Sequence, residues 1–223
     1  MLDTSAPNLA RAYDYLLGGG ANFAADRSLA GRLTALYPRA PELLSSSRTY
    51  RADSLADIAA RGIRQYVDVG AGLPTRPSTH SVVRGARDAQ VVYVDNDPAV
   101  VEHTSSLVPP GVRAVEGELA EPEALLDGLD LARPACLVLT MVLQVLDPGT
   151  ARAVTGVLVR ALAPGSHVVI TVGAGEEGRL PDAVAPGGFT ADDMAAFFAG
   201  LDLVPPGITQ GPVLCATGIK RGG

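Results

Sequence analysis

The residues with the clearest chemical potential are two glycines and an aspartate that end neighbouring apolar runs. Gly70 and Gly72 lie in the segment DVGAG that ends the run 65–69, and Asp95 ends the run 90–95. Glycine lets the backbone turn sharply and lets a ligand approach without a Cβ in the way. A carboxylate at the end of the next run can accept both hydroxyl protons of a ribose. Together these residues predict a nucleoside site beyond the carboxyl ends of two strands.

The spacing within the glycine turn indicates which nucleoside it suits. A dinucleotide fingerprint, G-x-G-x-x-G, requires a third glycine at the position that Thr75 occupies. Pro74 stiffens the loop, and the sequence has no G-x-x-x-x-G-K-[ST] motif for a triphosphate. The turn therefore favours a nucleoside without a diphosphate, and S-adenosylmethionine is the obvious choice. Turn glycines that bind no ligand, or an NAD-dependent oxidoreductase, which Thr75 disfavours, are the alternatives.

Two further polar residues end the next apolar runs along the chain. Glu118, after the run 112–116, could accept a hydrogen bond from an adenine amino group, or could be a solvated loop acid. Thr140 ends the run 135–140, where residues usually face the reactive part of the ligand, or it could be a satisfied strand-end hydroxyl. Both residues extend the predicted nucleoside site.

The elements that must position these residues alternate between short apolar runs and helical segments after residue 64. The runs 65–69, 90–95, 112–116, 135–140 and 167–172 are apolar on both faces, as parallel strands covered by helices must be. The runs 201–204 and 213–219 are too close for a helical crossover and predict an antiparallel hairpin at the sheet edge. The fold class is therefore α/β, with a Rossmann-like, doubly wound and mostly parallel sheet.

Helix signals complete this division of the chain. Residues 8–17, 23–36 and 42–61 show helical patterns, which predict an N-terminal helical unit over 1–63 and a nucleoside-binding domain over 64–223. Asp97-Pro98 and Asp147-Pro148 predict helix starts, and Thr190 with Asp193 resembles a capping box. The Gly- and Pro-rich stretch 173–188 predicts a surface loop.

Composition excludes several classes of protein. The net charge is −6, Trp is absent and aromatic residues make up 4%, which argues against nucleic-acid binding. Two cysteines and three histidines, all far apart, form no metal-ligand pattern, so we predict no metal.

No apolar stretch reaches the roughly 18 residues of a membrane span, and residues 1–10 lack signal-peptide features. We expect a cytoplasmic protein with no membrane partner.

Several segments together resemble one known family. These are YDYLLGG (13–19), NFAADR (22–27), GIRQYVDVGAGLPT (62–75) and VVYVDNDP (91–98). Over nearly the whole chain, the sequence is similar to the actinobacterial S-adenosylmethionine-dependent methyltransferase family catalogued as DUF574. The resemblance implies a class I methyltransferase fold of seven strands with the last one antiparallel. It also implies that the N-terminal helices form a cap over the cofactor S-adenosyl-L-methionine.

The cap supplies the remaining candidate residues. Tyr13 is a candidate for binding the cofactor carboxylate, with Asn22 and Arg27 as further polar partners. The cofactor-binding set that we predict is Tyr13, Asn22, Asp68, Gly70, Ala71, Gly72, Asp95, Asn96, Glu118, Leu119 and Thr140. Tyr13, Tyr15, Gln144 and His80 are weak catalytic candidates, with core packing or surface positions as the simpler alternatives.

The sequence departs from the family on the presumed acceptor side. Gln144 stands in a segment where the family usually has Leu-His-Phe, and Thr171-Val172-Gly173 replaces a common Ser-His pair. A histidine base beside the fourth strand is therefore absent. We predict a methyltransferase for a small molecule, in secondary metabolism. The alternative is a protein that uses S-adenosylmethionine for a non-methylating reaction or as a sensor. A homodimer through the N-terminal helices or the edge hairpin is also expected.

Overall fold

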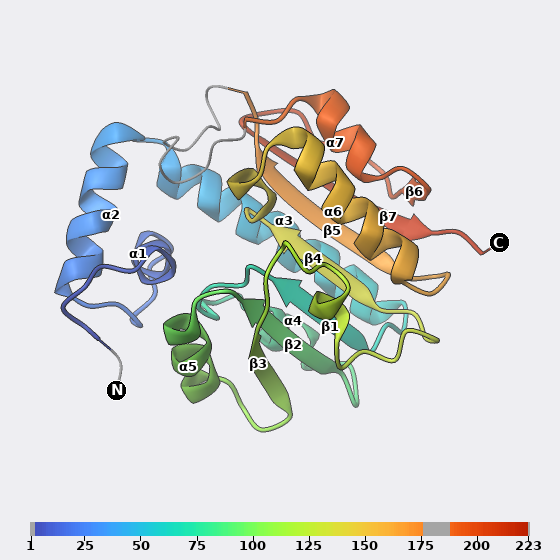
Figure 1. Cartoon of the computed structure of the whole chain (residues 1–223), viewed down its shortest axis with the longest axis horizontal. Helices are drawn as coiled ribbons and strands as arrows, with labels where there is room; N and C mark the ends of the chain where they lie inside the picture. The colour runs from blue at the N-terminus through green and yellow to red at the C-terminus, as the bar shows by residue number, and fades with distance from the viewer. Residues whose placement is uncertain (1–2, 176–187, 223) are drawn as a thin grey trace.

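A single seven-stranded sheet forms the centre of the computed structural model, which describes residues 3–175 and 188–222 (Figure 1). The strands, in the sheet order β3-β2-β1-β4-β5-β7-β6, are Val112–Glu116, Gln90–Asp95, Gln65–Val69, Cys136–Thr140, His167–Gly173, Val213–Lys220 and Leu201–Leu203. β1 to β5 are parallel, and β7 pairs antiparallel with both β5 and β6. The α/β class, the edge hairpin and the seven strands with the last one antiparallel, which the resemblance implies, are confirmed.

Helices cover both faces of this sheet, which explains why the central strands are apolar on both faces. All residues of β1 and β5 are buried. On one face they pack with α6 (Pro148–Ala161) and α7 (Ala191–Phe197). On the other face they pack with α3 (Ala40–Ala60) and α4 (Thr79–Val83). The remaining elements are α1 (Leu9–Leu16), α2 (Ala24–Leu36), α5 (Pro98–Leu107) and two 3₁₀ turns, η1 (Ala124–Leu126) and η2 (Leu143–Val145).

Helix starts follow the capping residues closely. The side chains of Asp97 and Asp147 accept backbone hydrogen bonds at the starts of α5 and α6, and Thr190 with Asp193 forms a capping box on α7. α3 begins two residues before the predicted position because Pro41 lies in its first turn. Backbone N–H groups of the first turn have no partner within the helix, so a proline, which has no N–H, is tolerated there. Of the predicted loop 173–188, Gly173 ends β5 and residues 176–187 lie outside the described residues.

The N-terminal helices divide between two positions. α3 packs against β4, β5, β7 and α4, so it belongs to the layer that covers the sheet. α1 and α2 pack against each other beyond the carboxyl ends of the strands (Figure 1). Of the helices predicted to form a cap over 1–63, only α1 and α2 lie beyond the strand ends, and these two helices are called the cap below. In the ranges 3–175 and 188–222, no helix has the length and apolar character that a membrane span requires.

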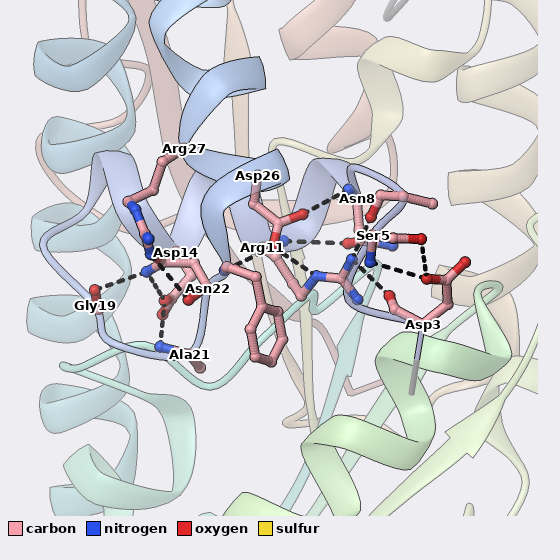
Figure 2. Close-up of polar contacts among 12 residues, drawn as sticks. Asp3, Ser5, Asn8, Arg11, Asp14, Gly19, Ala21, Asn22, Asp26 and Arg27 are labelled. Carbon is pink, nitrogen blue, oxygen red and sulfur yellow. Dashed lines mark hydrogen bonds and ion pairs between the residues drawn. The ribbon is translucent and has the colours of Figure 1, made fainter. Parts of the chain in front are cut away.

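A buried ion pair holds α1 to α2 (Figure 2). Arg11 Nε lies 2.8 Å from Asp26 Oδ2, and the two side chains are 4% and 0% exposed. The backbone amides of Asn8 and Phe23 also donate to the Asp26 carboxylate, at 2.8 and 2.9 Å. Burial alone would raise the pKa of Asp26, but the hydrogen bonds from Arg11 and these amides lower it. The carboxylate is thus ionised and fully engaged, and it fixes the angle between the two helices.

This pair generates a stability prediction. Replacing Asp26 with Asn leaves the Arg11 charge buried without a counter-ion, so the free energy of unfolding should fall by about 3–5 kcal/mol. Urea denaturation measures this change, and hydrogen exchange should show that α1 and α2 lose protection first. The exposed pair between Arg221 and Asp202 is the matched control, and Arg221→Met should change stability by at most about 1 kcal/mol. Equal effects of the two variants would show that the buried pair is not important for the cap.

Candidate functional site

A cavity of about 280 Å³ lies where the carboxyl ends of β1, β2 and β4 meet α1 and α3. Segments far apart in the sequence form its walls, which is expected at the ligand-binding edge of an open parallel sheet. Its lining residues are Asn8, Leu9, Ala10, Tyr13, Leu17, Leu44, Ser47, Arg48, Gly70, Ala71, Gly72, Leu73, Asp95, Asn96, Asp97, Val100, Thr140, Met141, Val142 and Val145.

The turn after β1 requires glycine at two positions. Gly70 and Gly72 have φ values of +62° and +59°, in the left-handed region that other residues rarely adopt. A Cβ on Gly70 would lie 2.1 Å from Cγ2 of Val142, so the turn also leaves no room for a side chain there. The main chain therefore forms this wall of the cavity, and it can approach a ligand directly.

Asp95 holds the turn in place and faces the cavity. Its Oδ2 accepts a hydrogen bond from Gly72 N at 2.9 Å, and its Oδ1 accepts one from Asp97 N at 3.2 Å. Burial raises the pKa of Asp95, and the amides of Gly72 and Asp97 partly offset this rise. Each carboxylate oxygen has a further lone pair, so Asp95 can still accept hydrogen bonds from two vicinal hydroxyls.

Both ends of α1 are tied to the loops that form the cavity. At its start, Asn8 caps the helix and its Nδ2 donates to Asp97 Oδ2 at 2.5 Å. Near its end, the buried Asp14 accepts a hydrogen bond from Thr75 Oγ1 at 2.5 Å. It also accepts one from Ala21 N at 2.8 Å (Figure 2). Thr75 occupies the position of the third glycine in a dinucleotide fingerprint, and here its hydroxyl binds the cap.

The backbone after β4 is strained at the cavity. Met141 has a φ of +56°, although it carries a side chain, and its amide donates to Thr171 O at 2.9 Å. A residue held in the left-handed region costs about 1–3 kcal/mol and usually occurs where function requires it. Thr140, Met141 and Val142 all line the cavity. The strain thus lies at the strand end that we expect to face the reactive part of the ligand.

The structure brings part of the predicted cofactor set together. Seven of its members line the cavity, namely Tyr13, Gly70, Ala71, Gly72, Asp95, Asn96 and Thr140. Glu118 is exposed after β3, and Leu119 packs against the core. Asn22 donates to Asp14 Oδ2 and Gly19 O, so it closes the turn between α1 and α2 (Figure 2). Asp68 is buried in the core.

Asp68 precedes the turn and has two buried partners. Its Oδ2 accepts a hydrogen bond from Thr79 Oγ1 at 2.5 Å and lies 3.4 Å from Arg51 Nη1. Its place in DVGAG suggested ligand contact, but both partners are buried residues of the helices that cover one face of the sheet, Arg51 on α3 and Thr79 on α4. Asp68 therefore acts on the turn through packing and hydrogen bonds.

Of the catalytic candidates, only Tyr13 lines the cavity. Tyr15 is 45% exposed and does not line the cavity. Gln144 is buried, and its Oε1 accepts from Gly173 N at 3.3 Å. His80 Nδ1 lies 2.9 Å from the hydroxyl of Tyr93, outside the cavity. The exposed Arg27 donates to Asn22 Oδ1.

Among the lining residues that sequence reasoning missed are Ser47, Arg48, Asp97 and Met141. Ser47 and Arg48 lie on α3, which we expected in the cap without assigning its faces. Asp97 was recognised only as a helix cap. No feature of the sequence marks Met141, because a left-handed methionine is decided by the packing around it.

The chain is similar to known methyltransferases over nearly its whole length. The model of a family described as S-adenosyl methyltransferase matches residues 1–214. A solved putative methyltransferase from Thermobifida fusca YX is 30% identical, with a TM-score of 0.86, and the match covers 99% of this chain and 97% of that one. A DUF574 family protein from Streptomyces avermitilis MA-4680 is 28% identical, with a TM-score of 0.85 and coverage of 99% and 100%.

A more distant structure shares the fold alone. The N-methyltransferase NodS from Bradyrhizobium japonicum WM9, solved with S-adenosyl-L-homocysteine, is 14% identical with a TM-score of 0.54, and the match covers 77% of this chain and 86% of that one. The comparison with curated proteins gives no match.

The glycine turn generates a second prediction. Gly70→Ala should reduce the free energy of unfolding, by about 1–2 kcal/mol for the left-handed backbone and by about 1–3 kcal/mol for the clash with Val142. Gly31→Ala is the control, because a Cβ added to that helical glycine would have no atom within 4 Å, and the change should stabilise α2 by about 1 kcal/mol. Urea denaturation compares the two variants. A Gly70→Ala protein as stable as the wild type would refute the steric argument.

Proposed function

Because the chain belongs to the S-adenosyl methyltransferase family, we propose that it transfers the methyl group of S-adenosyl-L-methionine to a small organic acceptor in this cavity. The observation that carries the proposal is the enclosure of the glycine turn and Asp95 by α1 and α3. A site covered by helices and lined mainly by apolar side chains suits a small molecule. Cytoplasmic location, a homodimer and a role in secondary metabolism stay predictions from the sequence.

The residues present fit this cofactor. The glycines of the turn expose bare main chain to the cavity, and Asp95 keeps free lone pairs beside it. Asp95 would hold the ribose hydroxyls, the main chain of 70–72 would follow the methionine portion, and Thr140 would lie near its reactive end. The cofactor supplies a methyl group that is already activated on a sulfonium. The protein must therefore orient the reactants and exclude water.

The walls around the acceptor end suit these two tasks. Leu17, Leu44 and Val145 line the cavity and exclude water, while α1 closes it. Burial raises the pKa of Tyr13, so its hydroxyl stays protonated at neutral pH and can donate a hydrogen bond but not accept a proton. Within the described ranges, the only carboxylates that line the cavity are Asp95 and Asp97, and both hold backbone amides. We propose that the acceptor supplies its own free electron pair, as an amine or an already ionised group does.

The altered acceptor side, which includes Gln144, motivated the alternative that the protein uses the cofactor for a non-methylating reaction or as a sensor. The structure places the Gln144 side chain in the core beside Gly173, away from the cavity. The absence of a histidine at this position therefore removes no group from the cavity wall, and methyl transfer is the function that the geometry supports best.

Turnover tests the proposal directly. The protein would be incubated with methyl-labelled S-adenosylmethionine and a bacterial metabolite extract, which is then separated into small-molecule and macromolecular fractions. We expect label in the small-molecule fraction together with an equal amount of S-adenosylhomocysteine. Label only in the macromolecular fraction would contradict the proposed acceptor class. Unchanged cofactor beside a formed product would favour the non-methylating alternative.

The ribose contact generates a binding prediction. Asp95→Ala should weaken S-adenosylhomocysteine binding by more than about tenfold, because hydrogen bonds to a charged group contribute about 1.5–3 kcal/mol. Isothermal titration calorimetry measures the dissociation constant. Glu118→Ala is the matched control at the end of the neighbouring strand, and it should bind as the wild type does because Glu118 is exposed outside the cavity. If Asp95→Ala keeps full affinity, Asp95 does not hold the ribose.

A further inference from the structure

Arg48 is a cation that faces the cavity without a partner of opposite charge. It lies on α3, and the cavity wall next to it is formed by Ser47 and the turn 70–73. Its Nη1 donates to the carbonyl of Thr75 at 3.4 Å, a long hydrogen bond. In the part of the chain that the structure describes, no carboxylate lies within ion-pair distance of this guanidinium.

Arg51, less than one turn further along α3, is different. It pairs with Asp68, and its Nη2 donates to the carbonyl of Pro77. The carboxylate of Asp68 also accepts from Thr79, so it is committed to the core. Arg51 therefore supports the turn from inside the protein. Arg48 faces the ligand side of the same turn and has no such partner.

The charge of Arg48 is only partly compensated by the protein. Removal from water, and then repulsion from Arg51, lower the pKa of Arg48 to about 9 against the weaker attraction of Asp68 and Asp14, so the guanidinium is still protonated at neutral pH. A partly buried charge without a counter-ion destabilises the protein unless a ligand supplies that counter-ion. The cavity thus selects for a ligand with an anionic group close to α3.

We propose that Arg48 binds the carboxylate of the methionine portion of the cofactor, with the Tyr13 hydroxyl as a second donor. This inference rests on the cofactor site proposed above. A guanidinium suits a carboxylate because two parallel N–H groups match its two oxygens. The half-buried Tyr13 lines the same cavity from α1, and its hydroxyl has no hydrogen-bond partner among the described residues. Arg48 would then distinguish nucleosides that carry an amino-acid portion from those that lack one.

A pair of nucleosides that differ in this carboxylate tests the proposal. S-adenosylhomocysteine carries the amino-acid portion, and 5′-methylthioadenosine has the same thioadenosine without it. By calorimetry, Arg48→Met should weaken S-adenosylhomocysteine binding about tenfold or more, and should leave the affinity for methylthioadenosine within about twofold. Arg48→Lys should restore part of the lost affinity, because it keeps the charge but lacks the paired donors.

Two further variants separate ligand contact from structural support. Arg51→Met should weaken both nucleosides together, because Arg51 supports the turn. Arg27→Met removes an exposed arginine outside the cavity and should change neither affinity. Arg48→Met should also unfold at a urea concentration no lower than that of the wild type when no ligand is bound, since it removes an uncompensated charge.

The contrary outcomes are distinct. A parallel loss of both affinities in Arg48→Met would show a structural role and overturn the proposal. Unchanged binding of S-adenosylhomocysteine would overturn it too, and a lower kcat/KM for an acceptor would then assign Arg48 to an anionic acceptor instead. A wild-type protein that binds neither nucleoside would refute the cofactor site itself rather than the role of Arg48.

Discussion

The hydrogen bond from Gly72 N to Asp95 joins the two strand ends on which the site depends. The turn after β1 needs left-handed backbone at Gly70 and Gly72, and the Asp95 carboxylate fixes where that turn lies. Val142 packs against the bare Cα of Gly70 and brings the end of β4 to the same place. Because β1, β2 and β4 are parallel neighbours, a single hydrogen bond and a single missing side chain help to align all three strand ends around one cavity.

The cap is held to this frame by buried polar groups. Asn8 links the start of α1 to Asp97, and Asp14 links its end to Thr75. The ion pair between Arg11 and Asp26 then sets α2 against α1. Each group is buried or half-buried and has a specific partner, so a shifted helix would leave polar atoms unsatisfied. The cap therefore has one preferred position over the cavity.

Much of this fold was predictable because its local signals agree with its tertiary structure. The strands follow the apolar runs to within a residue at each end, since both faces of the sheet are covered. Asp97, Asp147 and Thr190 start their helices as capping chemistry requires. The position of α3 was less predictable, because an amphipathic helix can pack on a cap or on a sheet with the same periodicity. Asp68 was assigned to the ligand for a similar reason, as a motif does not say which side of a turn a carboxylate faces.

By itself, the sequence determined the α/β class, the order of elements and the strand ends at which the cavity lies. These depend on hydrophobic periodicity, capping residues and glycine, which act over a few residues. Tertiary structure alone decided which charges face the cavity. Arg48 and Arg51 are three residues apart on one helix, yet one meets a cavity and the other meets Asp68. Such differences arise from contacts between segments distant in the chain, and electrostatic energies depend on each group's partners and burial more than on its residue type.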